Sequence, residues 1–113
     1  MDCLFCKIIA QKIPANIIFQ DDQVIAFDDI NPQAKIHKII IPRRHIATLN
    51  DLQNSDCDLI GHMVESAAKI ANEFGIAQNG YRLVMNCNPE GGQTVFHIHL
   101  HLVGGRQMNW PPG

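Results

Sequence analysis

Within the stretch 94–103, near the C-terminal end of the chain, hydrophobic residues and histidines alternate strictly over residues 96–102. His97, His99 and His101 are each followed by an aliphatic residue. A period of two predicts a β-strand with two different faces. One face is then expected to carry the three imidazoles, and the aliphatic face is expected to pack into a core.

Shorter apolar runs predict further strands. The runs at residues 17–20 and 24–27 are separated by two aspartates, which predicts a β-hairpin. Residues 37–41 form a β-rich run that ends at a proline, and residues 81–86 predict one more strand before a loop. These runs and the histidine stretch give the chain enough strands for one sheet.

The clearest helix is predicted to begin at Ser55 and to end before Gly75. Ser55 precedes Asp58 by three residues, which is the spacing of a capping box, and glycine commonly follows a helix end. One apolar stripe at helical spacing lies between them, formed by Leu59, Met63, Ala67, Ile70 and Phe74. A short helical turn is expected at residues 7–12. Strands grouped around one long helix predict an α+β fold with an antiparallel sheet.

The composition narrows the class of protein. A chain of 113 residues fits one domain, and hydrophobic and charged fractions of 46% and 18% are ordinary for a soluble globular protein. The net charge of −2, without a block of Lys or Arg, argues against a general nucleic-acid or membrane-surface binder. Without a long apolar run or a leader-like start, we expect a cytoplasmic protein, whose four cysteines are free thiols or metal ligands.

The histidine row indicates a chemical site, because histidine is not a strong strand former and half of the six histidines stand here. Adjacent imidazoles on a strand lie about 6.5–7 Å apart, so one metal ion cannot easily bind all three. Two of them could share a metal, or His99 could be a nucleophile or general base. The glycine loop at residues 90–94 directly precedes the row and predicts a seat for a phosphate or oxyanion.

Residues 97–103 resemble the signature of the histidine triad family of nucleotide hydrolases and transferases, in which three histidines alternate with hydrophobic residues. Residues 91–113, including the closing Trp110 and its two prolines, are similar to the HINT branch, the purine nucleoside phosphoramidases. We therefore expect a single domain over residues 1–113 with a C-terminal tail at residues 104–113. The similarity also takes in residues 5–9, 13–15, 27–34 and 41–42.

The resemblance implies a five-stranded antiparallel sheet with one long and one short helix. It also implies a homodimer in which the two sheets join. Trp110 and the prolines that follow form a stiff apolar tail, which normally frays unless something holds it. We therefore expect Trp110 to pack across the dimer interface, as similar tails in the branch reach toward the partner.

For the reaction, the resemblance implies that His99 attacks the α-phosphorus of a nucleotide and forms a nucleotidyl-histidine, which water then hydrolyses. His101 would donate a hydrogen bond to a phosphate oxygen, and His97 and His37 would orient the row. No cofactor is required by this chemistry. The expected substrate is a purine nucleoside 5′-phosphoramidate; the alternatives are a dinucleoside polyphosphate hydrolase of the same fold and a zinc-dependent hydrolase with His97 and His99 on a catalytic metal.

Further residues match the nucleotide site of the family. Gln93 and Thr94 are expected to hydrogen-bond the leaving group as charge develops on it. Threonine stands at position 94 where the branch usually has serine, which bears on the shape of the leaving group. Asp29 would bind the ribose hydroxyls. The other expected contacts are Asn86, Gly92, Val95, His99 and His101 around the phosphate, and Phe5, Ile8, Phe27 and Ile30 in an apolar slot for the base.

A separate group of residues predicts a structural metal site. Cys3 and Cys6 have the C-x-x-C spacing of half a zinc site, and His45 is a candidate third ligand. In relatives that carry this cysteine pair, the first histidine of the triad completes the set, which implies His97 here. The alternative is two reduced thiols on a short helix. Structural zinc is thus possible, without a role in catalysis.

Overall fold

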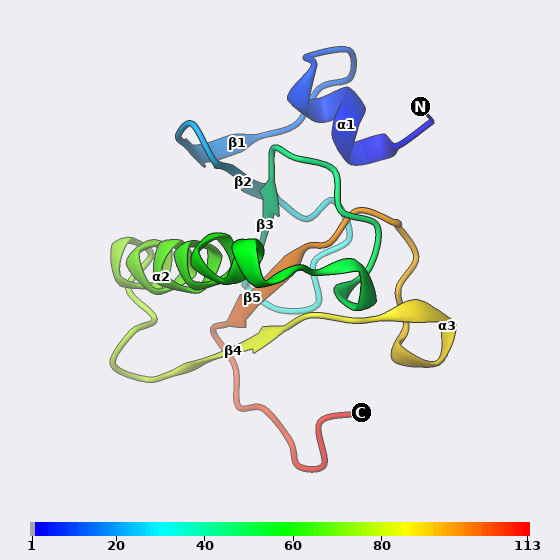
Figure 1. The fold of residues 1–113 in the computed structure, drawn as a ribbon. Helices are drawn as coiled ribbons and strands as arrows, with labels where there is room; N and C mark the ends of the chain where they lie inside the picture. The colour runs from blue at the N-terminus through cyan, green and yellow to red at the C-terminus, as the bar shows by residue number, and fades with distance from the viewer. Residues whose placement is uncertain (1) are drawn as a thin grey trace.

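The computed structural model describes residues 2–113 and contains one five-stranded antiparallel sheet (Figure 1). The order across the sheet is β1-β2-β3-β5-β4, so β3 and β5 each pair on both sides. The predicted α+β class with a five-stranded antiparallel sheet is confirmed. The strands are β1 (Ile17–Gln20), β2 (Val24–Asp28), β3 (Ile36–Pro42), β4 (Tyr81–Val84) and β5 (Leu100–Gly104).

The long helix α2 (Cys57–Glu73) packs on the sheet with the face that its apolar stripe predicted, and Met63, Ala67 and Ile70 are buried there. The predicted start at Ser55 was wrong by two residues. Residues 54–56 form a 3₁₀ turn, and Asp56 stands at the N-cap. The buried carboxylate of Asp56 accepts the N–H of Gln53 at 2.7 Å, and this contact shapes the entry to the helix.

Two short helices, α1 and α3, complete the α-helical structure. Helix α1 (Leu4–Ile9) is the short helix that the resemblance implies, and it begins before the expected residues 7–12. Cys3 is its N-cap, and the Cys3 sulfur accepts the N–H of Cys6 at 3.4 Å. Helix α3 (Asn88–Gly91) is a single turn that the sequence did not predict, and it overlaps the start of the glycine loop. A further 3₁₀ turn spans Leu49–Asp51.

The two faces of the sheet carry separate cores. Helix α2 covers one face, which includes Ile40, Leu100 and Leu102. Helix α1 covers the other face, where Phe5 and Ile8 pack against β2 and β3. Successive strand residues point to opposite faces, so each inner strand contributes to both cores. The segment that precedes β5 contacts α1 through the rings of His97 and His99, which both meet the ring of Phe5.

The predicted strand over residues 94–103 was wrong in its first part, because β5 begins only at Leu100. The ladder between β3 and β5 ends with the pair Ile40–Leu100. Beyond it, Ile98 donates its N–H to the carbonyl of Ile46 at 2.7 Å instead of to a strand. Burial does not alternate along this segment: Ile98 is buried in the α2-side core, and His97 and His99 on either side of it are buried as well. Residues 95–97 form bends.

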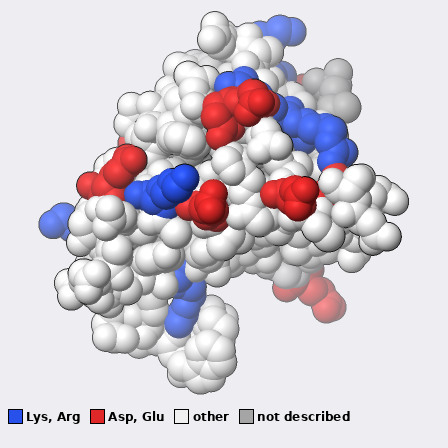
Figure 2. Space-filling view, turned by 60° about the vertical axis from the view of Figure 1, so that its left-hand side comes forward, with Lys and Arg blue, Asp and Glu red and all other residues white. Residues whose placement is uncertain are grey.

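The chain after β5 runs back along β4. The guanidinium of Arg82 donates to the carbonyl of Asn109 at 3.0 Å, and the side chain of Trp110 is 82% exposed in the single chain. Among residues 2–113, no helix combines the length and apolarity that a membrane span requires. On the face drawn in Figure 2, acidic and basic side chains lie in small mixed groups.

Candidate active site

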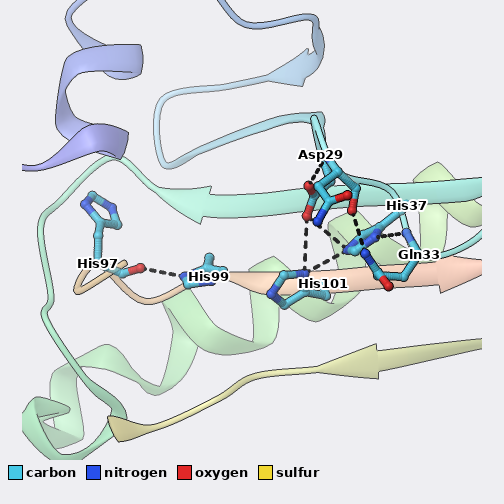
Figure 3. A network of polar contacts seen from close by, with 7 residues as sticks. Asp29, Gln33, His37, His97, His99 and His101 are labelled. Carbon is cyan, nitrogen blue, oxygen red and sulfur yellow. Dashed lines mark hydrogen bonds and ion pairs between the residues drawn. The ribbon is translucent and has the colours of Figure 1, made fainter. Parts of the chain in front are cut away.

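His99 lies immediately before β5 with its ring buried under helix α1. The edge of its imidazole meets the ring of Phe5, with the ring centroids 5.0 Å apart. Nδ1 of His99 lies 2.8 Å from the main-chain oxygen of His97 (Figure 3). A carbonyl oxygen only accepts, so Nδ1 carries the hydrogen and Nε2 of the neutral ring presents a lone pair. The fold thus selects the tautomer in which Nε2 can act as a nucleophile.

A second chain of hydrogen bonds determines the tautomer of His101 (Figure 3). The main-chain N–H of Gln33 donates to Nδ1 of His37 at 3.0 Å. His37 therefore carries its hydrogen on Nε2, which lies 2.9 Å from Nδ1 of His101. His101 accepts at Nδ1 and keeps a hydrogen on Nε2, so that nitrogen is a donor for a ligand oxygen.

Asp29 adds a carboxylate to the same network. Its Oδ2 lies 3.3 Å from Nε2 of His37 and 3.9 Å from Nδ1 of His101. Its Oδ1 accepts the N–H of Asn31 at 2.8 Å, which fixes the carboxylate in the turn after β2. Nε2 of His37 thus hydrogen-bonds His101 and also lies close to a carboxylate.

The imidazoles of the site are held neutral. Burial lowers the pKa of His99 and of His37, and the nearby Asp29 carboxylate opposes part of this change. Burial, together with repulsion from His99 and His37, lowers the pKa of His101 to about 4. Neutral rings are what the two hydrogen-bond chains require, because a doubly protonated ring has no acceptor nitrogen.

The three histidines do not form one row. The rings of His99 and His101 are neighbours, with centroids 5.0 Å apart, and His37 joins them from β3. The ring of His97 instead turns into a separate, fully buried position, because its segment is not part of the strand. The alternation along the sequence therefore correctly predicted that the rings of His99 and His101 are neighbours. It did not predict that the ring of His97 points away from them.

The ring of His97 enters the predicted metal cluster. Its Nε2 donates to the carbonyl of Pro42 at 2.8 Å, so the lone pair of Nδ1 points toward the two cysteines and His45. Nδ1 lies 3.5 Å and 3.6 Å from the sulfurs of Cys3 and Cys6, and 3.2 Å from Nδ1 of His45. The Cys6 sulfur lies 3.4 Å from Nδ1 of His45.

These four donor atoms, which all lie within 4.8 Å of one another, fit a tetrahedral zinc ion. Bonds of about 2.0–2.3 Å in a tetrahedron place the ligand atoms roughly 3.3–3.8 Å apart. Two sulfurs and two imidazole nitrogens are the donors that structural zinc prefers. The bond from the His97 ring to Pro42 is the outer contact that commonly orients a histidine ligand.

Gln93 differs from its predicted role. Its side chain is 5% exposed, and its Oε1 accepts the N–H of Asn88 at 2.8 Å. Its Nε2 donates to the carbonyls of Ala47 and Val95 at 2.8 Å and 3.1 Å. Because both amide hydrogens are used, Gln93 has no donor left for a leaving group. It holds the glycine loop against the segment that follows β3.

The glycine loop leaves Thr94 exposed and Asn86 half-buried beside the turn. Gly92 follows helix α3 with φ +88°, a conformation that favours glycine, and a Cβ placed there would lie 3.9 Å from Nδ2 of Asn86. The hydroxyl of Thr94 is therefore the exposed polar group at the end of the loop, whereas Val95 packs partly into the α1-side core.

Comparison with known proteins agrees with this geometry. The family model described as "Scavenger mRNA decapping enzyme C-term binding" matches residues 2–110. The crystal structure of a HIT family hydrolase from Legionella pneumophila Philadelphia 1 superposes with a TM-score of 0.97 and 54% identity, covering 99% of this chain and 100% of that one.

This chain belongs to the histidine triad family. The purine nucleoside phosphoramidase of Escherichia coli K12 is 51% identical over 107 residues, which are 95% of this chain and 90% of that protein. A HIT family hydrolase from Clostridium thermocellum is 45% identical, with a TM-score of 0.93 over 96% of this chain and 94% of that one. The resemblance inferred from the histidine motif is confirmed.

The residues expected around the base of a nucleotide are only partly gathered in this histidine triad protein. Phe5, Ile8 and Phe27 lie together in the α1-side core, where the two phenylalanine rings meet edge to face at 5.6 Å. Ile30 is 99% exposed in the turn after β2 and packs against none of them in the single chain. Asp29 precedes it and faces His37.

Sequence reasoning missed Gln33 and Pro42. The N–H of Gln33 and the carbonyl of Pro42 determine which nitrogens of His37 and His97 carry hydrogen. Both act through the main chain, so their side chains carry no signal of this role. The one available signal for Gln33 is that the turn at residues 29–36 directly precedes His37 in the sequence, so that a main-chain N–H of this turn can reach the His37 ring.

Proposed function

We propose that this histidine triad protein is a purine nucleoside phosphoramidase that cleaves the P–N bond between AMP or GMP and an amine. One observation carries the proposal: Nδ1 of His99 donates to the carbonyl of His97 at 2.8 Å, which leaves the lone pair on Nε2. The 51% identity to the Escherichia coli phosphoramidase supports the choice of substrate class.

The reaction has two displacement steps. Nε2 of His99 attacks the α-phosphorus, a P–N bond to His99 forms, and the P–N bond to the amine breaks as the amine takes up a proton from solvent. Water then attacks the phosphorus, the P–N bond to His99 breaks, and nucleoside monophosphate and free His99 are released while the proton of the attacking water returns to solvent. Nε2–H of His101 is assigned to a phosphate oxygen, where a donor stabilises the charge that develops. The hydroxyl of Thr94 is assigned to the leaving nitrogen.

The rest of the nucleotide is assigned to residues near these groups. Asp29 has a fixed carboxylate beside His37 that can accept the ribose hydroxyls. Ile30 is fully exposed in the turn after β2 and free to cover a base, and Phe5, Ile8 and Phe27 are assigned to the base with it. The phosphate is assigned to the loop with Asn86, Gly92 and Val95, where Gly92 leaves the backbone open.

A catalytic zinc on His97 and His99 is not favoured by the geometry. Nδ1 of His99 donates to a carbonyl, and the lone pair of His97 points toward Cys3 and Cys6. The two rings thus direct their free nitrogens to different places. We assign zinc to the cluster of Cys3, Cys6, His45 and His97, where it would join helix α1 to the loops before β5 and after β3 and stabilise the fold.

We also propose a homodimer that works in the cytoplasm. Strand β4 forms one edge of the sheet, and a strand edge with unpaired backbone groups is suited to pairing with a second copy. Trp110 is 82% exposed next to this edge, since Arg82 of β4 holds Asn109. Four free thiols fit a reducing compartment.

The test compares wild type with His99→Ala on adenosine 5′-phosphoramidate. We expect His99→Ala to lose about a thousandfold or more in kcat, as enzymes do when a covalent nucleophile is removed. Mass spectrometry of wild type quenched during turnover should show AMP on His99. His62→Ala, which changes a surface histidine on α2, is the matched control. Unchanged turnover in His99→Ala refutes the mechanism, and faster cleavage of a dinucleoside polyphosphate would reassign the substrate.

A further inference from the structure

His97 takes part in two sites through different atoms. Its side chain, which is 0% exposed, points into the cluster with Cys3, Cys6 and His45. Its main-chain oxygen accepts the hydrogen of Nδ1 of His99. One residue therefore connects the expected metal site to the carbonyl that selects the nucleophilic tautomer; Figure 3 shows the contact of this carbonyl with His99.

The peptide unit between His97 and Ile98 makes the connection tight. A peptide bond is planar, so its C=O and N–H turn together. The C=O of His97 accepts from His99, and the N–H of Ile98 donates to the carbonyl of Ile46 at 2.7 Å. Ile46 directly follows His45, whose ring is a member of the cluster. The same peptide plane is thus joined to the cluster covalently through His97, and by a hydrogen bond through Ile46, the neighbour of His45.

The strand ladder gives this peptide no support. The pairing between β3 and β5 ends at Leu100, and residues 95–97 are bends. The ring of His97 is held by its bond to Pro42 and by its position among the sulfurs of Cys3 and Cys6. The orientation of the His97 carbonyl, which faces His99, therefore depends on the contacts that fix the rings of His97 and His45.

We propose that His97 and His45 are positioning residues for catalysis, and that occupancy of their cluster by zinc regulates the nucleophilic step. With four ligands joined by one ion, the peptide plane is fixed and His99 stays in the Nδ1–H tautomer. Without the ion, the plane can turn, and the hydrogen of His99 distributes over both ring nitrogens. The inference rests on the proposed role of His99 and adds a means of controlling it.

This arrangement predicts a fall in kcat on loss of zinc. Asp29, which is assigned to the ribose, belongs to the turn after β2 and not to the cluster, whereas Phe5 of the proposed base slot lies on α1 between the two cysteines. At metal sites, loss of an outer contact that orients a histidine typically costs about 10–100-fold in activity. We therefore expect kcat to fall about tenfold or more on loss of zinc.

The experiment uses the full chain in zinc-loaded form, after removal of zinc with a chelator, and after zinc is added back. Elemental analysis measures bound zinc. Nitrogen NMR of histidine-labelled protein, assigned with His99→Ala, shows which ring nitrogen of His99 carries hydrogen. We expect the Nδ1–H form in the loaded protein, a mixture after removal, and recovery of both the tautomer and kcat on readdition. Since the tautomer is read without substrate, it is independent of whether a phosphoramidate is the correct substrate.

Variants separate this role from folding. Cys3→Ser combined with Cys6→Ser should lose zinc and reproduce the depleted protein, whereas Cys57→Ser, at an exposed cysteine of α2, should behave as wild type. If zinc removal unfolds the protein, His45→Gln gives the comparison, since it keeps both thiolates and His97. Less than a tenth of an equivalent of zinc in the loaded protein overturns the proposal. So does a folded, zinc-free protein with an unchanged His99 tautomer and kcat.

Discussion

Nε2 of His37 lies 2.9 Å from Nδ1 of His101, although the two residues are 64 positions apart in the chain. Strands β3 and β5 bring them together, with Ile39 paired to His101 in the ladder. Because the Gln33 N–H occupies the other nitrogen of His37, the hydrogen between the two rings belongs to His37. The N–H of Gln33 thus determines, through His37, that Nε2 of His101 carries the hydrogen that can be donated to a ligand.

Replacement of His37 tests this chain. His37→Phe keeps a ring of similar shape but removes the donor to His101, so His101 can place its hydrogen on either nitrogen. We expect kcat on adenosine 5′-phosphoramidate to fall about 10–100-fold. His62→Phe, on the surface of α2, is the control and should keep the wild-type rate. Wild-type kcat in His37→Phe would show that His101 needs no orienting partner.

The buried histidines should make stability depend on pH. The pKa of His101 is about 4 in the folded chain, against 6.5 for the free side chain. As pH falls below about 6.5, the unfolded chain binds this proton first, so the free energy of unfolding decreases down to about pH 4. Above about pH 6.5 this contribution is complete.

Urea unfolding of wild type and His101→Asn at several pH values measures this contribution. The difference between the two should fall between about pH 6.5 and pH 4 and stay constant above this range. Using the difference removes the contributions of histidines that do not contact His101, such as His62, and of a metal in the separate cluster. A difference that does not vary with pH would mean that His101 titrates normally in the folded chain.

Gln93 is expected to act on stability rather than on the leaving group. Gln93→Met has a similar volume but leaves the N–H of Asn88 and the carbonyls of Ala47 and Val95 without their partner. We expect the free energy of unfolding to fall by about 3 kcal/mol. Gln107→Met, at an exposed residue, should change it little. Equal stability of the two variants in urea would contradict the structural role of Gln93.

The assembly can be tested by sedimentation. We expect wild type to sediment as a dimer at micromolar concentration, and Trp110→Ala to raise the dimer dissociation constant by about tenfold or more, because a buried tryptophan is a frequent interface anchor. Ile17→Ala, on the opposite edge strand β1, is the control. A wild-type monomer at micromolar concentration would dispose of the proposed interface.

Much of the fold could be predicted from local patterns of hydrophobic residues in the sequence. The hairpin of β1 and β2 and the strands β3 and β4 follow the apolar runs that predicted them, and the buried stripe of α2 follows its helical period. Such patterns are local because side-chain direction repeats every two residues in a strand and every 3.6 in a helix. The residues 94–99 were the exception, since a strand also needs a partner, and β3 offers none beyond Ile40.

By itself, the sequence determined which family the chain belongs to, which residue types meet, and where along the chain the chemistry lies. Only the tertiary structure decided that, of three evenly spaced histidines, His97 enters the metal cluster while His99 and His101 lie together in the candidate active site. Their partners are distant in sequence: Cys3 is 94 positions from His97, and His37 is 64 positions from His101. A tautomer depends on the one atom that faces each ring nitrogen, and folding alone brings that atom into place.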